Sequence, residues 1–224
     1  MWSSPPRISE RWGRRIVTAR ADVLDYTALN EGIRRGVDEL GGLDLLCANA
    51  GLASYGGVLD LTPEQWGDVM DVHVTGSWNT VRAAAPFLSR SDAGSIVLTS
   101  STGSLRAEAY IAHYVTAKHG QVRLTKSLVI ELSPFGIRGI AIYPTSANAH
   151  MITNAVTQRL MSENAGGSEK LDQAARAKNL LGVPWIDAID VANAVLFVHL
   201  DEARYITESA WPWMRAPYWS ELTF

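Results

Sequence analysis

Residues 43–51 read LDLLCANAG, an almost unbroken apolar run that ends in asparagine, alanine and glycine. A short apolar run bounded by turn residues is typical of a strand buried on both faces, as in a parallel sheet. Working outward, we predict a strand at 16–23, a helix at 26–40 and a helix at 62–88, which begins with the capping sequence Thr62-Pro63. Alternating strands and helices predict an α/β fold.

The same alternation continues toward the C-terminus. We predict strands at 95–100 and 137–143, and helices at 112–132 and 189–200. The whole pattern predicts a Rossmann-like, doubly wound parallel sheet covered by helices on both faces. Residues 145–182 are polar and mostly helical in pattern, whereas the tryptophan-rich stretch at 211–224 has no clear period.

The composition is that of one globular domain covering residues 1–224, with 47% hydrophobic residues. Twenty lysines and arginines against 23 acids give a net charge of −3, which argues against nucleic acid or an anionic membrane as a partner. A single cysteine excludes an internal disulfide, suits a reducing compartment and predicts a cytoplasmic protein. The five histidines lack the spacing of a metal site, so no metal is expected.

Ser101, Tyr114 and Lys118 form the most informative group of polar residues. Tyr114 and Lys118 lie four residues apart and therefore share one helix face. An ammonium beside a phenol favours the phenolate and is expected to lower the tyrosine pKa, which suits Tyr114 to proton exchange with an alcohol or carbonyl. Ser101 follows a predicted strand, and ligands of doubly wound sheets bind at the carboxyl ends of the strands.

From about residue 14 to 207 the chain resembles the short-chain dehydrogenase/reductase family, with 208–224 as a divergent tail. Within the family it is similar to the mycofactocin-coupled, carveol-dehydrogenase-like branch. The segments that carry the resemblance are ADV (21–23), CANAG (47–51), TGSWNT (75–80), SIVLTSS (95–101), HYVTAKHG (113–120), GIR (136–138) and DEARYIT (201–207).

The resemblance implies catalytic roles for four residues. Tyr114 would be the general acid/base, Lys118 would lower its pKa and bind the nicotinamide ribose, and Ser101 would orient the reacting oxygen. His73 stands where the family has an asparagine in a proton relay. A histidine can relay protons, and it can equally be a tolerated polar substitution in a decaying site; the sequence leaves both interpretations open.

The resemblance also implies a cofactor, NAD, with NADP not excluded, and a small alcohol or ketone as substrate. Family positions near the adenine correspond to Asp22 and Val23. Those bordering the cofactor correspond to Asn49, Ala50 and Gly51, and those at its nicotinamide end to Pro144, Ala147 and the other residues up to Ala149. The helices at 62–88 and 112–132 would pack between the subunits of a homo-oligomer.

The N-terminal region departs from the family pattern. The glycine-rich turn TGxxxGxG, whose amides hold the pyrophosphate, is not found, and only Gly13 precedes Asp22. We therefore expect a truncated chain that lacks the first two family strands. The sheet would be incomplete, with an exposed edge at 43–48, and NAD binding would be weak or lost. The alternative function is that of a catalytically silent subunit that only associates.

Overall fold

The computed structural model describes residues 13–155, 157–159, 162, 173, 175–176, 179, 181–208 and 210–212. Its helices and strands, in chain order, are α2 (Tyr26–Leu40), β1 (Leu45–Ala48), α3 (Pro63–Met70), the π-helical turn η1 (Asp71–Thr75), α4 (Gly76–Leu88), β2 (Ser95–Thr99), η2 (Thr102–Ser104), α5 (Ala112–Leu132), η3 (Ser133–Phe135), β3 (Arg138–Tyr143), β4 (Ala147–Asn148), α6 (His150–Thr153), β5 (Ile186–Asp187), α9 (Ala188–His199), η4 (Asp201–Ala203) and β6 (Ala210–Pro212).

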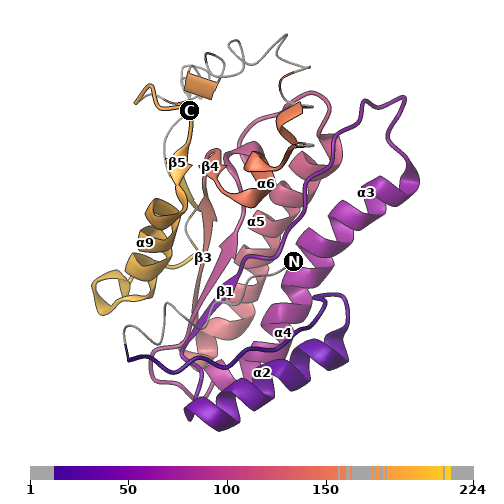
Figure 1. Cartoon of the computed structure of the whole chain (residues 1–224). Coiled ribbons are helices and arrows are strands. Elements are labelled where there is room, and N and C mark those ends of the chain that lie inside the picture. Colours follow the sequence, from indigo (N-terminus) through magenta and orange to yellow (C-terminus); the bar gives the residue numbers. More distant parts are fainter. Residues whose placement is uncertain are drawn as a thin grey trace.

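The main sheet is parallel and has the strand order β1-β2-β3-β6. Helices α4 and α5 lie on one face and α9 lies on the other (Figure 1). Side chains of β2 alternate between two cores, because Ile96 and Leu98 point toward α4 and α5 whereas Val97 packs with Val198 of α9. The predicted Rossmann-like parallel sheet is confirmed.

Strand β1 lies at one end of this sheet, and only part of it is buried. Leu46 and Ala48 are buried, whereas Leu45 is 43% exposed and Cys47 is also exposed. The prediction of a strand buried on both faces is therefore wrong. The cause is that α9 covers β2 and β3 and, among the described residues, no strand continues the sheet beyond β1. In the described part of the chain, β1 is therefore an edge strand, as expected.

The predicted strand at 16–23 is also wrong, because this segment is irregular. Its polar backbone is bonded to helices: the Arg35 guanidinium donates to the Thr18 carbonyl, and Asn79 Nδ2 donates to the Val23 carbonyl at 3.0 Å. A strand needs a neighbouring strand to pair its amides and carbonyls. Here the segment runs along α2 and α4, where helix side chains take that place.

The predicted helix at 62–88 is divided by the π-helical turn η1, which contains His73. Its start is as predicted: Thr62 Oγ1 accepts from the Gln65 amide at 3.2 Å, and Gln65 Oε1 accepts from the Thr62 amide at 3.0 Å.

The residue after the π-helical turn is packed closely. A Cβ on Gly76 would lie 2.5 Å from a methyl of Val23, so a larger residue does not fit there. Single π-helical turns inside helices are frequent at functional sites.

At the other end of the sheet, β6 pairs with β3 even though its last residue is Pro212. Proline has no amide to donate and is found in strands mainly at sheet edges, which is where β6 lies among the described strands. Of the predicted helical region at 145–182, the described residues include the short helix α6 and the strand β4, which pairs with β5 just after this region. Residues 213–224 lie outside the described residues.

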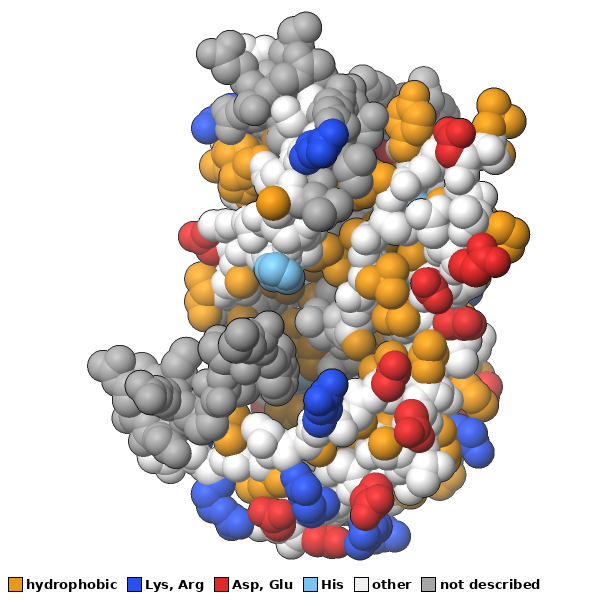
Figure 2. All heavy atoms as spheres, turned by 45° about the vertical axis from the view of Figure 1, so that its right-hand side comes forward, with side chains coloured by type: hydrophobic (Ala, Val, Ile, Leu, Met, Phe, Trp, Pro, Cys, Tyr) orange, Lys and Arg blue, Asp and Glu red, His pale blue; other side chains and the backbone are white. Residues whose placement is uncertain are grey.

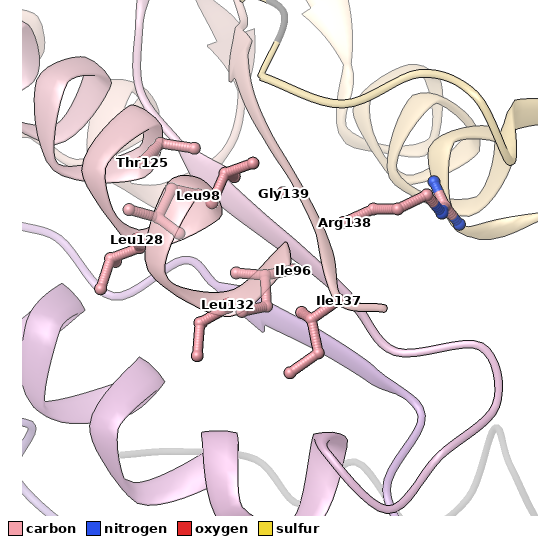
Figure 3. Close-up of a pocket in the computed structure, with 9 residues that line it drawn as sticks. Ile96, Leu98, Thr125, Leu128, Leu132, Ile137, Arg138 and Gly139 are labelled. Atoms are coloured by element: carbon pink, nitrogen blue, oxygen red, sulfur yellow. The ribbon is translucent and has the colours of Figure 1, made fainter. Parts of the chain in front are cut away.

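A small cavity separates α5 from the sheet, near the amino ends of β2 and β3. Figure 3 shows Ile96, Leu128 and Leu132 among its mostly apolar lining, while Arg138 points away toward α9. There Arg138 Nη1 donates to the Val198 carbonyl at 2.9 Å. The cavity is a packing gap far from the carboxyl ends of the strands, and it offers no polar group for a substrate.

The mixture of basic and acidic side chains on the surface (Figure 2) agrees with the net charge of −3. In Figure 2, Lys and Arg side chains lie among Asp and Glu at the lower end, around α2, and acidic side chains gather along the right-hand side. Within the described part of the chain, no helix is long and apolar enough to cross a membrane. The same residues contain no group of histidine, cysteine and acidic side chains that could hold a metal ion.

Candidate active site

The carboxyl ends of β1, β2 and β3 meet at one edge of the sheet, and backbone hydrogen bonds join the ends of β2 and β3 there. The Ser100 amide donates to the Ile142 carbonyl at 2.9 Å, and the Thr102 amide donates to the Pro144 carbonyl at 3.0 Å. Ser100 Oγ also donates to the Lys118 carbonyl of α5 at 2.9 Å. These bonds fix the beginning of the η2 turn next to α5, so Ser101 and Tyr114 are held on adjoining elements.

Ser101 and Tyr114 are in direct contact. Hydrogen bonding with Ser101 is one of the influences on the pKa of Tyr114, and Ser101 Oγ accepts from the Gly103 amide at 3.1 Å. Gly103 lies against both side chains, since a Cβ there would be 3.4 Å from Ser101 Oγ and 3.6 Å from Tyr114 Cε1. The structure therefore brings together the serine and tyrosine that the sequence pattern paired.

Lys118 is buried below Tyr114, one turn further along α5. Its Nζ donates to the Thr99 carbonyl at 2.7 Å and lies 5.5 Å from the centroid of the Tyr114 ring. Burial disfavours the charged ammonium and lowers the pKa of Lys118 to about 7. The amino group is therefore able to gain or lose a proton near neutral pH.

The pKa of Tyr114 moves in the opposite direction from the one that the sequence suggested. Burial raises it above its usual value, the Ser101 hydrogen bond lowers it by less, and the nearby Tyr55 and Glu108 raise it further. The expectation that Lys118 lowers this pKa is not met in the chain alone. The physical reason is that burial acts on both groups, keeping the phenol protonated and weakening the lysine charge.

His73 is fully buried and faces the same site. Its ring meets the Tyr114 ring edge-on, with centroids 5.4 Å apart, and its Nε2 lies 2.8 Å from the Leu52 carbonyl. The Leu52 amide also lies 3.3 Å from Nε2, so this nitrogen donates to the carbonyl in one tautomer and accepts from the amide in the other, with the carbonyl contact the shorter of the two. The buried Nδ1 has no hydrogen-bond partner. Burial, followed by the charge on Lys118, lowers the pKa of His73 to about 4, so the ring is neutral at neutral pH.

The predicted cofactor residues divide into two groups. Asn49, Ala50 and Gly51 are exposed at the carboxyl end of β1, and Pro144 and Ala147 are half-buried after β3 and in β4. They border the same edge as Ser101 and Tyr114, so this edge fits the nicotinamide half of NAD.

Asp22 and Val23 lie away from that edge, in the irregular segment along α2 and α4. Asp22 Oδ1 accepts from the Leu24 amide at 2.9 Å, and the N-terminus of α2 is capped by Asp25. Among the described residues that precede Asp22, no glycine-rich turn offers its amides to a pyrophosphate. The described residues therefore fit the nicotinamide end of the cofactor better than its phosphates.

Sequence reasoning missed one group of residues beside Tyr114. Ser54 Oγ lies 2.6 Å from His113 Nε2, and Tyr55 acts electrostatically on Tyr114. Ser54 and His113 are 59 positions apart. No motif connects them, so only the folded chain reveals the pair.

Comparison with known proteins identifies the family of this chain. The family model described as "Enoyl-(Acyl carrier protein) reductase" matches residues 5–212. The chain is 40% identical over 207 residues to (-)-trans-carveol dehydrogenase of Rhodococcus erythropolis, which covers 91% of this chain and 75% of that protein. Among solved structures it is similar to carveol dehydrogenase from Mycobacterium avium in complex with NAD, with a TM-score of 0.87 and 37% identity over 95% of this chain and 80% of that one.

A second solved structure, a short chain dehydrogenase from Mycobacterium paratuberculosis bound to NAD, has a TM-score of 0.81 and 33% identity. That likeness covers 92% of this chain and 75% of the other. The extent of these matches, together with the arrangement of Ser101, Tyr114 and Lys118, shows that this chain belongs to the short-chain dehydrogenase/reductase family.

Proposed function

We propose that the chain is an oxidoreductase that interconverts a small alcohol and its ketone, with NAD rather than NADP as cofactor. The observation that carries this proposal is the contact of Ser101 with Tyr114 above the buried Lys118, at the carboxyl edge of the sheet. When bound, NAD supplies the hydride chemistry. The two NAD complexes and the carveol dehydrogenases among the similar proteins support NAD and a terpene-like alcohol as the ligand classes.

The residues of the chain orient the substrate and move its proton. Ser101 and Tyr114 both present hydroxyl groups, so a substrate oxygen between them can receive two hydrogen bonds. Because the pKa of Tyr114 is raised, the phenol is protonated at neutral pH and can donate its proton to a carbonyl oxygen during reduction. Lys118, with a pKa of about 7, is suited to pass a proton to or from the site. Asn49, Ala50, Gly51, Pro144 and Ala147 would hold the nicotinamide end of the cofactor.

The test is NADH formation from carveol at high NAD concentration, compared between the native chain and Tyr114→Phe. Losing a positioned acid/base group typically costs about 10²–10⁴-fold in rate, so the variant should lose at least two orders of magnitude in kcat. A Tyr205→Phe variant is a suitable control, since Tyr205 is 87% exposed and lies beyond α9. Normal turnover by Tyr114→Phe would contradict the proposed role.

We further propose that NAD binds weakly to this chain, since the described residues offer the phosphates no amide cradle. Backbone donors at a helix N-terminus supply much of the binding of such phosphates in dinucleotide folds. Calorimetric titration should therefore give a dissociation constant of about 1 mM or higher, which corresponds to roughly −4 kcal/mol. A micromolar dissociation constant would disprove this part of the proposal.

A second candidate function is that of a catalytically silent subunit that associates with itself or with another family member. Exposed apolar side chains on the helices predicted to form subunit contacts favour it: Trp66 on α3 is 41% exposed, Trp78 on α4 43% and Ile130 on α5 67%. We propose that these helices mediate a homo-oligomer, and that the chain is cytoplasmic because its only thiol, Cys47, suits a reducing compartment. Sedimentation of the native chain and of Trp78→Glu would reveal such an oligomer as a loss of mass in the variant.

A further inference from the structure

Two loops meet beside Tyr114, and a serine–histidine pair joins one of them to α5. Ser54 lies on the segment that follows the carboxyl end of β1, and His113 is the second residue of α5. Ser54 Oγ and His113 Nε2 are 2.6 Å apart, and the His113 side chain is fully buried. His113 directly precedes Tyr114, so this hydrogen bond fixes the segment around Ser54 beside the first turn of α5, which carries the proposed acid/base residue.

The proton on His113 can be placed by counting hydrogen-bond partners. Its Nδ1 is buried and has no partner. An orphaned buried N–H is rarer in proteins than an orphaned acceptor, so the proton belongs on Nε2, where it is donated to Ser54 Oγ. Burial also lowers the pKa of His113, which keeps the ring neutral. The pair is therefore a neutral hydrogen bond that leaves the Ser54 hydroxyl proton free to bond elsewhere.

A second contact holds the same segment from the other side. The Gly56 amide donates to the Tyr110 carbonyl at 2.9 Å, and a Cβ on Gly57 would lie 3.7 Å from the Tyr110 ring. Tyr110 has a φ of 64°, a left-handed conformation that a residue with a bulky side chain keeps only where its surroundings enforce it. The loop that ends at Tyr110 also holds the Arg106–Glu108 ion pair, at 3.0 Å.

These contacts place Tyr55 between the two fixed points of its segment. Tyr55 and Glu108 both act electrostatically on Tyr114, and Glu108 acts on Tyr55 as well. The other polar groups facing Tyr114 are Ser101, Lys118 and His73. The Ser54–His113 and Gly56–Tyr110 hydrogen bonds hold the segment 54–56 beside the first turn of α5, which carries Tyr114, and we call this segment a wall of the site.

We propose that Ser54 and His113 form a latch that positions the segment 54–56, and with it Tyr55, against Tyr114 for the oxidoreduction. The proposal rests on the proposed function for the reaction that it serves. Neither residue takes part in the chemistry; both are positioning residues that act through the wall they hold in place. The latch should therefore govern turnover more than it governs global stability.

The experiment uses paired variants of the full chain. Ser54→Ala removes the acceptor and Ser54→Thr keeps it, while His113→Leu removes the donor and His113→Gln places an amide N–H near the position of Nε2. We expect the first variant of each pair to lower kcat about ten-fold, with a smaller change in KM, because one hydrogen bond typically accounts for a change of this size. The second variant of each pair should recover most of the loss.

The chain contains a matched control in a second serine–histidine pair. Ser95 Oγ lies 2.8 Å from His199 Nδ1, at the amino end of β2 and the end of α9, away from the site. Ser95→Ala should lower the thermal stability about as much as Ser54→Ala does and leave kcat unchanged. Equal kcat values for Ser54→Ala and Ser95→Ala would overturn the positioning role.

A second measurement does not depend on activity. Hydrogen exchange at the Gly56 amide, which is protected by the Tyr110 carbonyl, should accelerate about ten-fold in Ser54→Ala and stay unchanged in Ser95→Ala. Unchanged Gly56 exchange in Ser54→Ala would disprove the latch. If the native chain shows no turnover, the proposed function fails by itself, and the Gly56 exchange rate still decides whether the latch exists.

Discussion

The imidazole of His73 fills the space that a side chain at position 51 would need: a Cβ on Gly51 would lie 2.5 Å from His73 Cε1. Glycine at this position is therefore required by a protein side chain, in addition to any close approach of a cofactor. The contact also explains why the ring can lie between Leu52 and Tyr114.

Gly51→Ala should destabilise the fold by about 1–3 kcal/mol, the usual range for overpacking a rigid site. Denaturant unfolding of this variant, of His73→Asn and of the double variant would measure the coupling between the two positions. We expect the double variant to be more stable than the sum of the single effects predicts, because a smaller side chain at position 73 makes room for the added methyl group. Strict additivity would show that the contact carries no strain.

The buried Lys118 should make stability depend on pH above neutrality. Its pKa is about 7 in the folded chain and about 10.5 when exposed, so between these values the unfolded chain binds more protons. The contribution of Lys118 to the free energy of unfolding therefore increases as the pH rises from about 7 to about 10. The same contribution decreases as the pH falls back toward 7. Urea unfolding at both ends of this range should show a larger gain for the native chain than for Lys118→Met. An equal gain in the two proteins would mean that the pKa of Lys118 is not lowered on folding and that its ammonium stays charged in the folded chain.

The exposed face of β1 should promote aggregation. Leu45 is 43% exposed on a strand that has one strand neighbour among the described residues, and such edges readily pair with other chains. Leu45→Lys should reduce light scattering on heating without lowering the midpoint of unfolding by more than a few degrees. Leu59→Lys, at a side chain that is 94% exposed on the loop before α3, is the control for a simple gain of charge.

The capping box at the start of α3 should contribute measurably to stability. Thr62 and Gln65 exchange two hydrogen bonds there, and Thr62→Ala should cost about 1 kcal/mol. Thr62→Ser keeps the hydroxyl and should cost much less in the same denaturation experiment. If both variants lose the same free energy of unfolding, the loss comes from the methyl group of Thr62 rather than from its capping hydrogen bonds.

Much of the fold follows from local sequence. Helix α2 has the predicted bounds because Asp25 caps its start and Gly41, with a φ of 99°, ends it. Helix α5 likewise matches its prediction, and β2 and β3 match theirs to within one residue. The error at 16–23 has a non-local cause, since an apolar run becomes a strand only beside another strand, and here the neighbours are helices.

The candidate site likewise contains residues that could be predicted from the sequence and properties that could not. Ser101, Tyr114 and Lys118 could be found because their spacing is fixed by one strand end and one helix face. The direction of the Tyr114 pKa could not, because it depends on how deeply the phenol is buried and on Tyr55 and Glu108, which no motif connects to it. The π-helical turn around His73 was also hidden inside an otherwise helical pattern.

Because β1 lies at the end of the described sheet, the part of the site that follows β1 is held by fewer strand contacts than the part that follows β2. Asn49 and Gly51 continue from β1, which pairs with a single strand within the described part of the chain, whereas Ser101 continues from β2, which is bonded to strands on both sides. Local opening favours weakly paired elements, so the part that would hold a cofactor can fluctuate or unfold while the serine and tyrosine remain in contact. Ligand affinity and catalytic geometry would then be lost in separate steps as the chain is heated.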